Sequence, residues 1–286
     1  MGSGCGNWRR GSNVPKTEIT LVRLFILVTA ALLMSVAFAG APDQSSDRKA
    51  DPVTEIFSSE GVDGTLVVAS ANGEILHLHN DERSVTRFSP ASTFKIPNTL
   101  IALNLGVLES TDDSFSWDGV DRGLAAWNKD QTLLSAFRVS CVWCYQEIAR
   151  KVGLVQYETA LNLIGYGNQK VGDQVDRFWL NGVLRISAVE QIRFLKSLHG
   201  GSASYDREHI DIVKDVMREE QGADYVLYAK SGWTGPEQHV GWYVGYLEKA
   251  DGIWLFAMNM RMDEVTEAPL RKELTVESLR ALGILK

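Results

Sequence analysis

The sequence predicts an α+β fold, in which an antiparallel β-sheet is flanked by helices and carries an inserted helical subdomain. Three strand-like runs, 225–230, 240–247 and 253–260, follow one another near the end of the chain with only short turns between them. Strands in series without alternating helices favour antiparallel pairing over a doubly wound parallel sheet. The middle of the chain is mostly helical in pattern, so the strands of the sheet are expected to come from the two ends of the domain.

Residues 64–80 are predicted to form the first hairpin of that sheet. Two apolar, β-prone runs flank Asn72-Gly73, and this dipeptide is the strongest short signal for a hairpin. Together with the three late runs, the hairpin gives strands at both ends of one domain.

The helical middle is marked by its own start and stop signals. Ser187 and Glu190 have the spacing of a capping box, an apolar face follows at helical spacing, and Gly200 ends the pattern. Further helices are predicted over 145–152, 155–164 and 270–282, with Gly153 separating the first two. We therefore predict one catalytic domain over 40–286, with the helical subdomain inserted at about 106–205.

Composition restricts the class of protein. The 286 residues are 45% hydrophobic and 23% charged, which is typical of a globular chain. The formal net charge of −7 provides no basic footprint for nucleic acid. We expect no nucleic-acid partner.

The N-terminus indicates export. Four basic residues in the first 23 precede an uncharged apolar run over 24–41, which contains the small-x-small pattern Ala37-Phe38-Ala39. This order predicts a signal peptide over 1–39, although an uncleaved membrane anchor is the alternative, because the run approaches spanning length. We expect a periplasmic or secreted chain with no membrane contact after cleavage.

Cys141 and Cys144 are the cysteines that would remain after cleavage. A C-x-x-C pair in an exported protein is compatible with a redox pair, half of a zinc site or a short disulfide. No second cysteine or histidine pair at zinc spacing accompanies it, so we expect no metal. Two packed thiols beside a helix start are the favoured interpretation, and the sequence does not decide whether the pair is bonded.

Several familiar catalytic motifs are absent from the sequence: G-x-S-x-G, the P-loop, H-E-x-x-H and G-x-G-x-x-G. Five scattered histidines leave a Ser-His-Asp triad without an obvious base. Ser92 and Lys95, however, stand at i and i+3 before an apolar helical stretch, so their side chains face the same way. An uncharged lysine within hydrogen-bond reach can activate a serine, although S-x-x-K alone also fits a capping serine and a solvated lysine.

Two further motifs strengthen the catalytic interpretation. Ser140-Cys141-Val142 opens a helical segment, and Lys230-Ser231-Gly232 closes a strand before Trp233. The order S-x-x-K, S-x-V, K-[ST]-G resembles the penicillin-recognising serine enzymes. Three shorter matches are Trp117-Asp118-Gly119, Tyr166-Gly167-Asn168 and Phe178-Trp179-Leu180. From about residue 65 to 282, the chain resembles the class D β-lactamases, or oxacillinases.

The resemblance implies a role for each catalytic position. Ser92 is the acylated nucleophile, and Lys95 is the general base, carried in the family as an N-carboxylated lysine formed with carbon dioxide. Ser140 relays a proton to the leaving nitrogen, and Lys230 supplies positive charge to that relay. Trp179 donates a hydrogen bond to the lysine carbamate.

The resemblance also implies a substrate site. The backbone N–H groups of Ser92 and Trp233 form the oxyanion hole, and the Ser231 hydroxyl and Arg271 hold the substrate carboxylate. Gly232 and Val142 complete the substrate-binding positions. The implied substrate is a β-lactam, chiefly a penicillin of the oxacillin type, and a homodimer is left open.

Desolvation supports one of these roles independently. Val142, Phe94 and Trp179 are expected to surround Lys95 with apolar surface, which disfavours its ammonium form and lowers its pKa. Only a free amine adds carbon dioxide, so the same burial promotes N-carboxylation.

Two other functions remain as alternatives. A β-lactam sensor domain is acylated once and signals, but such domains follow several membrane-spanning helices, and this sequence has one short apolar run. A cell-wall transpeptidase or carboxypeptidase belongs to the same superfamily, but Val142 replaces the asparagine common there, and Trp179 matches the oxacillinases.

Overall fold

The computed structural model describes residues 51–180, 182–201 and 205–286. The predicted signal peptide over 1–39 lies outside these residues. Within the described ranges, no helix combines the length and apolar character needed to cross a membrane.

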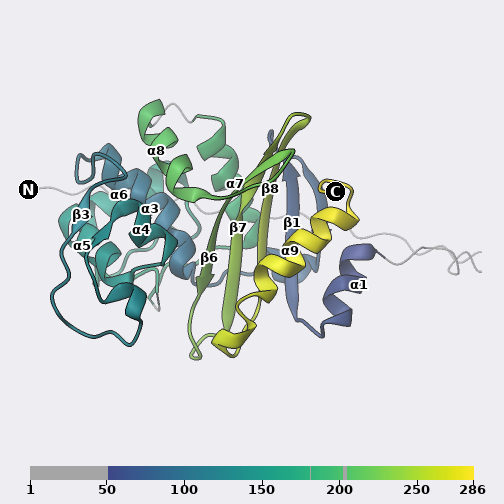
Figure 1. Ribbon diagram of the computed structural model, residues 1–286, viewed down its shortest axis with the longest axis horizontal. Coiled ribbons are helices and arrows are strands. Elements are labelled where there is room, and N and C mark those ends of the chain that lie inside the picture. Colours follow the sequence, from purple (N-terminus) through teal and green to yellow (C-terminus); the bar gives the residue numbers. More distant parts are fainter. Residues whose placement is uncertain (1–50, 181, 202–204) are drawn as a thin grey trace, which may run out of the picture. The chain divides into compact units, whose positions relative to one another are not determined.

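A six-stranded antiparallel sheet forms the centre of the described domain, with strand order β2-β1-β8-β7-β6-β5 (Figure 1). Its strands are β1 (Gly64–Ser70), β2 (Ile75–His79), β5 (Arg218–Gln221), β6 (Tyr225–Trp233), β7 (Val240–Lys249) and β8 (Gly252–Arg261). A separate two-stranded sheet pairs β3 (Ser114–Phe115) with β4 (Gln131–Thr132). The predicted antiparallel α+β fold is confirmed.

Nine α-helices and three 3₁₀ turns are present in the described ranges. The helices are α1 (Pro52–Ser59), α2 (Asp81–Val85), α3 (Lys95–Asn104), α4 (Leu133–Arg138), α5 (Val142–Val152), α6 (Leu154–Ile164), α7 (Ala188–His199), α8 (Arg207–Met217) and α9 (Leu270–Ala281). The 3₁₀ turns are η1 (Ala91–Phe94), η2 (Ala125–Trp127) and η3 (Val265–Glu267).

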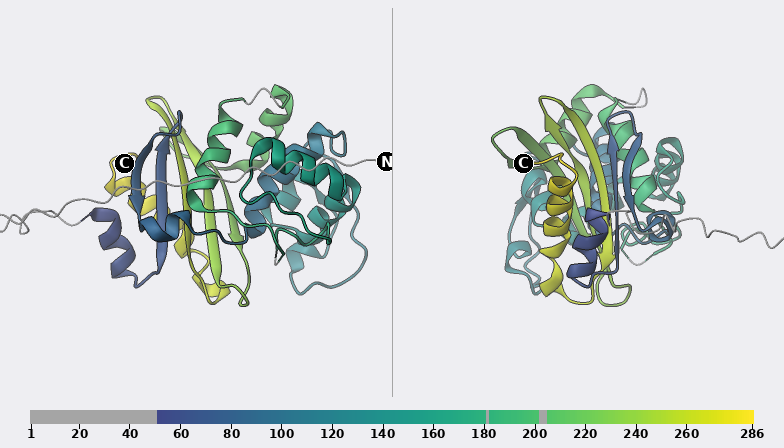
Figure 2. Two further views of the ribbon diagram at one scale, coloured as in Figure 1. Left: turned by 180° about the vertical axis from the view of Figure 1, so that it is seen from behind. Right: turned by 90° about the vertical axis from the view of Figure 1, so that its right-hand side faces the viewer.

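Helices cover both faces of the sheet, so the inner strands β1, β7 and β8 are largely buried on both sides, whereas the edge strands β2 and β5 are not. In β1, Leu66 and Val68 point into the apolar cluster shared with α1 and α9, whereas Val67 and Ala69 point into the larger opposite cluster. Figure 2 shows α1 and α9 together over one face. This double burial explains why the sequences of these inner strands are nearly continuous apolar runs.

The local signals for turns and caps are confirmed. Gly73 has φ +81° in the β1–β2 turn, and the Asn72 side chain accepts a hydrogen bond from the Glu74 N–H at 2.9 Å. The two reciprocal bonds of the capping box at the start of α7 join Ser187 and Glu190 at 3.0 and 3.3 Å.

Other boundaries differ from the predicted ones. Strand β6 continues past Lys230 to Trp233, because its backbone stays paired with β7 as far as Gly241. Helix α5 begins at Val142 rather than at residue 145. Strand β5 was missed because Arg218–Gln221 contains no apolar residue, and its backbone pairing with β6 defines it instead.

Helices α4, α5 and α6 lie within the stretch predicted as an inserted subdomain. In contrast, α7 packs on β8 and β1, and α8 packs on α3 and α4. The helical subdomain at about 106–205 therefore stays a prediction.

Candidate active site

The site begins where η1 passes into α3. Lys95 is the first residue of α3, and its Nζ lies 3.3 Å from the Oγ of Ser92 in η1. Ala91, immediately before the serine, has φ +48°, an uncommon conformation for a residue other than glycine. Ser92 is half-buried and Lys95 is fully buried, so the hydroxyl is reachable while the amine is withdrawn from water.

The surroundings of Lys95 favour its uncharged form. Burial lowers the pKa of Lys95 well below its usual value, and the nearby positive charge of Lys230 lowers it further. Its Nζ lies 4.7 Å from the centre of the Tyr145 ring, and within the described ranges it forms no ion pair with a carboxylate. The site thus places an amine whose uncharged form is favoured beside a serine hydroxyl.

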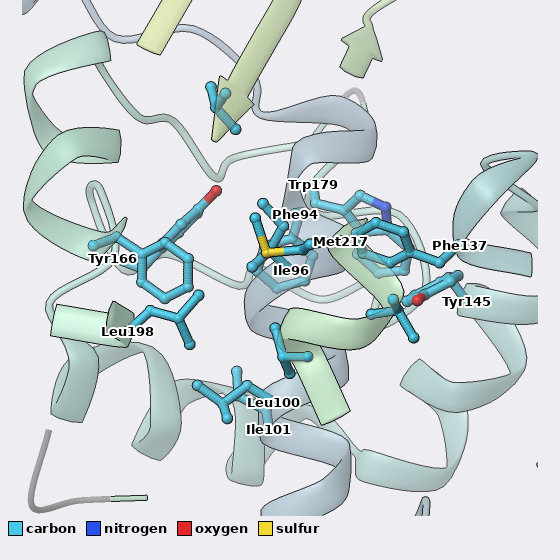
Figure 3. Packing of buried hydrophobic residues seen from close by; sticks show 14 of the residues in the cluster. Phe94, Ile96, Leu100, Ile101, Phe137, Tyr145, Tyr166, Trp179, Leu198 and Met217 are labelled. Atoms are coloured by element: carbon cyan, nitrogen blue, oxygen red, sulfur yellow. The ribbon is translucent and has the colours of Figure 1, made fainter. Parts of the chain in front are cut away.

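Aromatic side chains wall this part of the site. Phe94 and Trp179 stack with ring centres 5.5 Å apart, and the Ala91 N–H donates to the Trp179 carbonyl at 3.0 Å. Trp179, Phe137 and Tyr145 belong to the same buried cluster (Figure 3). In the described part of the chain, the Trp179 indole nitrogen has no hydrogen-bond partner, so its N–H is available for one.

Ser140 and Lys230 meet although 90 positions separate them. Lys230 Nζ donates to the Ser140 hydroxyl at 2.5 Å and to the Ser231 carbonyl at 3.0 Å. Burial and the charge of Arg271 lower the pKa of Lys230 to about 7, although Glu219 opposes the shift. Ser140 itself has φ +55°, and it immediately precedes Cys141, the N-cap of α5. The pair can therefore release and regain a proton near neutral pH.

The end of β6 lies close to η1, the turn that carries Ser92. The Thr234 N–H bonds to Val240 on β7 at 3.0 Å, so by the alternation of an antiparallel ladder the N–H of the preceding residue, Trp233, points away from β7. This end of β6 packs against η1: a Cβ on Gly232 would lie 3.1 Å from the Pro90 carbonyl oxygen. Because the first N–H groups of a helix lack intrahelical partners, Ser92 offers a second donor.

Arg271 approaches the same edge from the start of α9. Its Nη1 donates to the Gly232 carbonyl at 2.6 Å, and its Nε donates to the Ala268 carbonyl at 2.9 Å. Burial lowers its pKa to about 10. Gly241 makes room for it, since a Cβ there would lie 2.9 Å from the Arg271 Cδ. A pocket of about 390 Å³ opens here and includes Lys230, Ser231 and Arg271 in its lining.

The structure thus brings most of the predicted site residues to one place. Ser92 and Lys95 are in contact, and so are Ser140 and Lys230, while Arg271 reaches the backbone of the strand that carries the third motif. Val142 is the half-buried first residue of α5, and its part in walling Lys95 stays a prediction.

Two aromatic residues were missed by the sequence reasoning. Tyr145 lies under Lys95, and its hydroxyl is 2.8 Å from the Thr99 hydroxyl; Phe137 lies 5.6 Å from Lys230 Nζ. Their placement at helical spacing on the buried faces of α5 and α4 was a readable signal for packing, but it does not indicate which buried cation each ring meets.

The favoured interpretation of the C-x-x-C pair was wrong. Cys141 and Cys144 form a disulfide with Cα atoms 5.5 Å apart, and both side chains are buried. The bond forms because Cys141 caps α5: its sulfur accepts from the Cys144 N–H at 3.3 Å, which places both sulfurs over the first turn.

Fold and site together define a serine acyl-transfer enzyme that uses a buried lysine in place of a histidine. Residues 64–278 match the family model of the penicillin-binding protein transpeptidase domain. The chain is 36% identical over 262 residues to β-lactamase OXA-10 of Pseudomonas aeruginosa, covering 90% of this chain and 97% of the relative. It is 37% identical to β-lactamase OXA-48 of Klebsiella pneumoniae, covering 91% and 99%.

Solved structures agree with these sequence relatives. The class D β-lactamase YbXI from Nostoc superposes with a TM-score of 0.79 at 39% identity, covering 82% of this chain and 99% of that one. The class D enzyme FUS-1 (OXA-85) from Fusobacterium nucleatum subsp. polymorphum gives 0.79 at 35% identity, covering 82% and 98%. The chain belongs to the class D β-lactamases.

Proposed function

We propose that this protein hydrolyses β-lactam antibiotics through an acyl-enzyme on Ser92. The observation that carries the proposal is the contact of 3.3 Å between Ser92 Oγ and the Nζ of Lys95, a fully buried lysine whose pKa lies well below its usual value. A serine hydroxyl needs a base to become a nucleophile, and only an unprotonated lysine can accept its proton.

Acylation follows from the order of these contacts. Ser92 Oγ attacks the lactam carbonyl carbon while its proton passes to Lys95, and the oxyanion is held by the N–H groups of Ser92 and Trp233. As the C–N bond breaks, the lactam nitrogen takes a proton from the Ser140 hydroxyl. Lys230, as an ammonium 2.5 Å away, returns that proton to Ser140.

Deacylation reverses the proton flow with water as the nucleophile. Acylation leaves Lys95 with the Ser92 proton and Lys230 one proton short, so a proton passes from Lys95 to Lys230 before Lys95 acts as a base again. Lys95 then accepts a proton from water as the water oxygen attacks the ester carbon, and Ser92 leaves with that proton returned by the lysine. No other titratable side chain is in contact with Ser92 in the described ranges, so the same lysine serves both half-reactions.

The residues present fit N-carboxylation of Lys95. The amine is buried and its uncharged form is favoured, and the Trp179 indole N–H lacks another partner in the described part of the chain. When carbon dioxide is bound, the modified lysine supplies a carboxylate that accepts protons. Trp179 would donate its N–H to that group, and the surrounding aromatic rings would keep water away from it.

The family also supports a substrate class and a location. Penicillins of the oxacillin type are the proposed substrates, with the ring carboxylate held by Arg271 and the Ser231 hydroxyl. Export to the periplasm or beyond is the proposed location, because the predicted signal peptide fits a chain whose targets act outside the cytoplasm.

Turnover distinguishes this proposal from a sensor that is acylated once. Purified chain is mixed with a tenfold excess of a penicillin, and loss of the lactam absorbance is followed to completion. We expect all of the penicillin to be opened. Consumption that stops at one equivalent, with a stable adduct on the protein, would contradict hydrolysis.

A further inference from the structure

The pocket beside the end of β6 is larger than a substrate carboxylate needs. Its volume of about 390 Å³ is within the range of pockets that hold whole ring systems. Arg138 from α4 and Arg218 from β5 line it, together with Lys230, Ser231 and Arg271. The predicted carboxylate-binding residues, Ser231 and Arg271, are therefore only part of the lining of this space.

The lining carries an excess of positive charge. In the described part of the chain, Arg138, Arg218 and Arg271 form no ion pair with a carboxylate. Arg218 donates to the side-chain carbonyl of Gln221, and Arg271 donates to main-chain carbonyls. This local excess contrasts with the net charge of −7 for the whole chain.

Among the described residues that line the pocket, Glu219 is the one acidic side chain, and it already has partners. Glu219 pairs with Lys272 at 2.9 Å and accepts a hydrogen bond from the Tyr243 hydroxyl at 3.0 Å. Consequently it offsets a neighbouring lysine and leaves the arginines uncompensated. The cations of the lining also repel one another: the positive charge of Arg271 lowers the pKa of Lys230.

A single ring carboxylate bound by Ser231 and Arg271 would neutralise only one of these cations. The remaining volume and the guanidinium groups of Arg138 and Arg218 can accept a second anion, provided that it is attached close to the first. A substituent entering here must therefore lie on the carboxylate side of the bicyclic ring. Cephalosporins carry a variable substituent at the ring carbon next to the carboxylate-bearing carbon, whereas penicillins carry two uncharged methyl groups at the corresponding position.

We infer that this pocket is a subsite for a second acidic group, and that it favours cephalosporins whose substituent beside the ring carboxylate bears its own carboxylate or sulfonate. The inference rests on the proposed function and narrows its substrate class. Arg138 and Arg218 act as specificity residues that contact this substituent, and they take no part in bond making.

The test compares two cephalosporins that differ only in that substituent, one acidic and one uncharged. Each competes with a reporter penicillin, which gives the second-order rate constant for acylation of Ser92 even when turnover is slow. At low ionic strength, we expect the acidic compound to acylate about fivefold faster or more. The ratio should fall toward one in 0.5 M salt, because charges near the surface are screened.

Arg138→Gln and Arg218→Gln should each lower that ratio by about two- to fivefold, the range expected for one partly exposed ion pair. Arg193→Gln on α7 is the matched control, since it removes one exposed charge that lies outside the pocket lining, and it should leave the ratio unchanged. A ratio near one in the unmodified enzyme, or an equal fall in the control, overturns the subsite. If the reporter penicillin itself is not opened, the proposed function fails instead.

Discussion

Replacing Arg271 with glutamine separates two roles that the geometry gives to one side chain. Arg271 lies against the Gly232 carbonyl at 2.6 Å, where its guanidinium can also reach a substrate carboxylate. A hydrogen bond to a charged group contributes about 1.5–3 kcal/mol. Arg271→Gln should therefore lower kcat/KM for a penicillin by about 10- to 150-fold.

The same substitution should move the pH profile. Lys230 must be protonated to resupply Ser140, so kcat/KM of the unmodified enzyme should fall as the pH rises through about 7, the pKa of Lys230. The charge of Arg271 is one cause of that lowered pKa. Without it, the pKa of Lys230 rises, the ammonium persists to higher pH, and the alkaline limb should shift upward.

The assay is kcat/KM for one penicillin between pH 5.5 and 9.5, for three variants. Arg271→Lys keeps the charge but lacks the planar fork, so it should lose activity while its alkaline limb stays in place. Arg193→Gln should match the unmodified enzyme both in kcat/KM and in the position of the alkaline limb. An alkaline limb that does not move in Arg271→Gln would refute the electrostatic coupling between Arg271 and Lys230.

Three further variants test other parts of the account. Ser92→Ala should abolish the penicillin adduct seen by intact-protein mass spectrometry, and an adduct that persists would assign the nucleophile elsewhere. Trp179→Ala should let acyl-enzyme accumulate, and added bicarbonate should restore part of the activity. The carbon-13 NMR signal of a labelled lysine carbamate should be weaker than in the unmodified enzyme. Equal signals would exclude the Trp179 indole as the hydrogen-bond partner of the carbamate. Replacing Cys141 and Cys144 together with alanine should lower the free energy of unfolding in urea by about 2 kcal/mol, the value expected for closing a four-residue loop, whereas an unchanged midpoint and slope would argue against the bond.

Much of the fold was readable because its signals are local. The hairpin at Asn72-Gly73 and the capping box at Ser187 each depend on residues a few positions apart, and both are present. Strands whose limits depend on pairing with a neighbouring strand could not be predicted from the sequence. Strand β5 has a wholly polar sequence, and β6 extends to Trp233 only because β7 pairs with it there.

The site residues divide in the same way, into contacts between residues near in sequence and contacts between residues far apart. Ser92 and Lys95 could be placed together from their spacing, but the contact between Ser140 and Lys230 spans 90 positions, and only the resemblance to a family suggested it. The ring of Tyr145 beneath Lys95 could not be predicted, because helical spacing reports that a side chain is buried and not which group it meets.

The central claim is that Lys95 is uncharged beside Ser92 near neutral pH. Lysine labelled with carbon-13 at Cε reports its own ionisation, and comparison with Lys95→Ala assigns the resonance. We predict that between pH 7 and 8 the Lys95 signal is that of a free amine or its carbamate, because burial disfavours the ammonium. A Lys95 signal that keeps its ammonium position up to pH 10 would contradict the account.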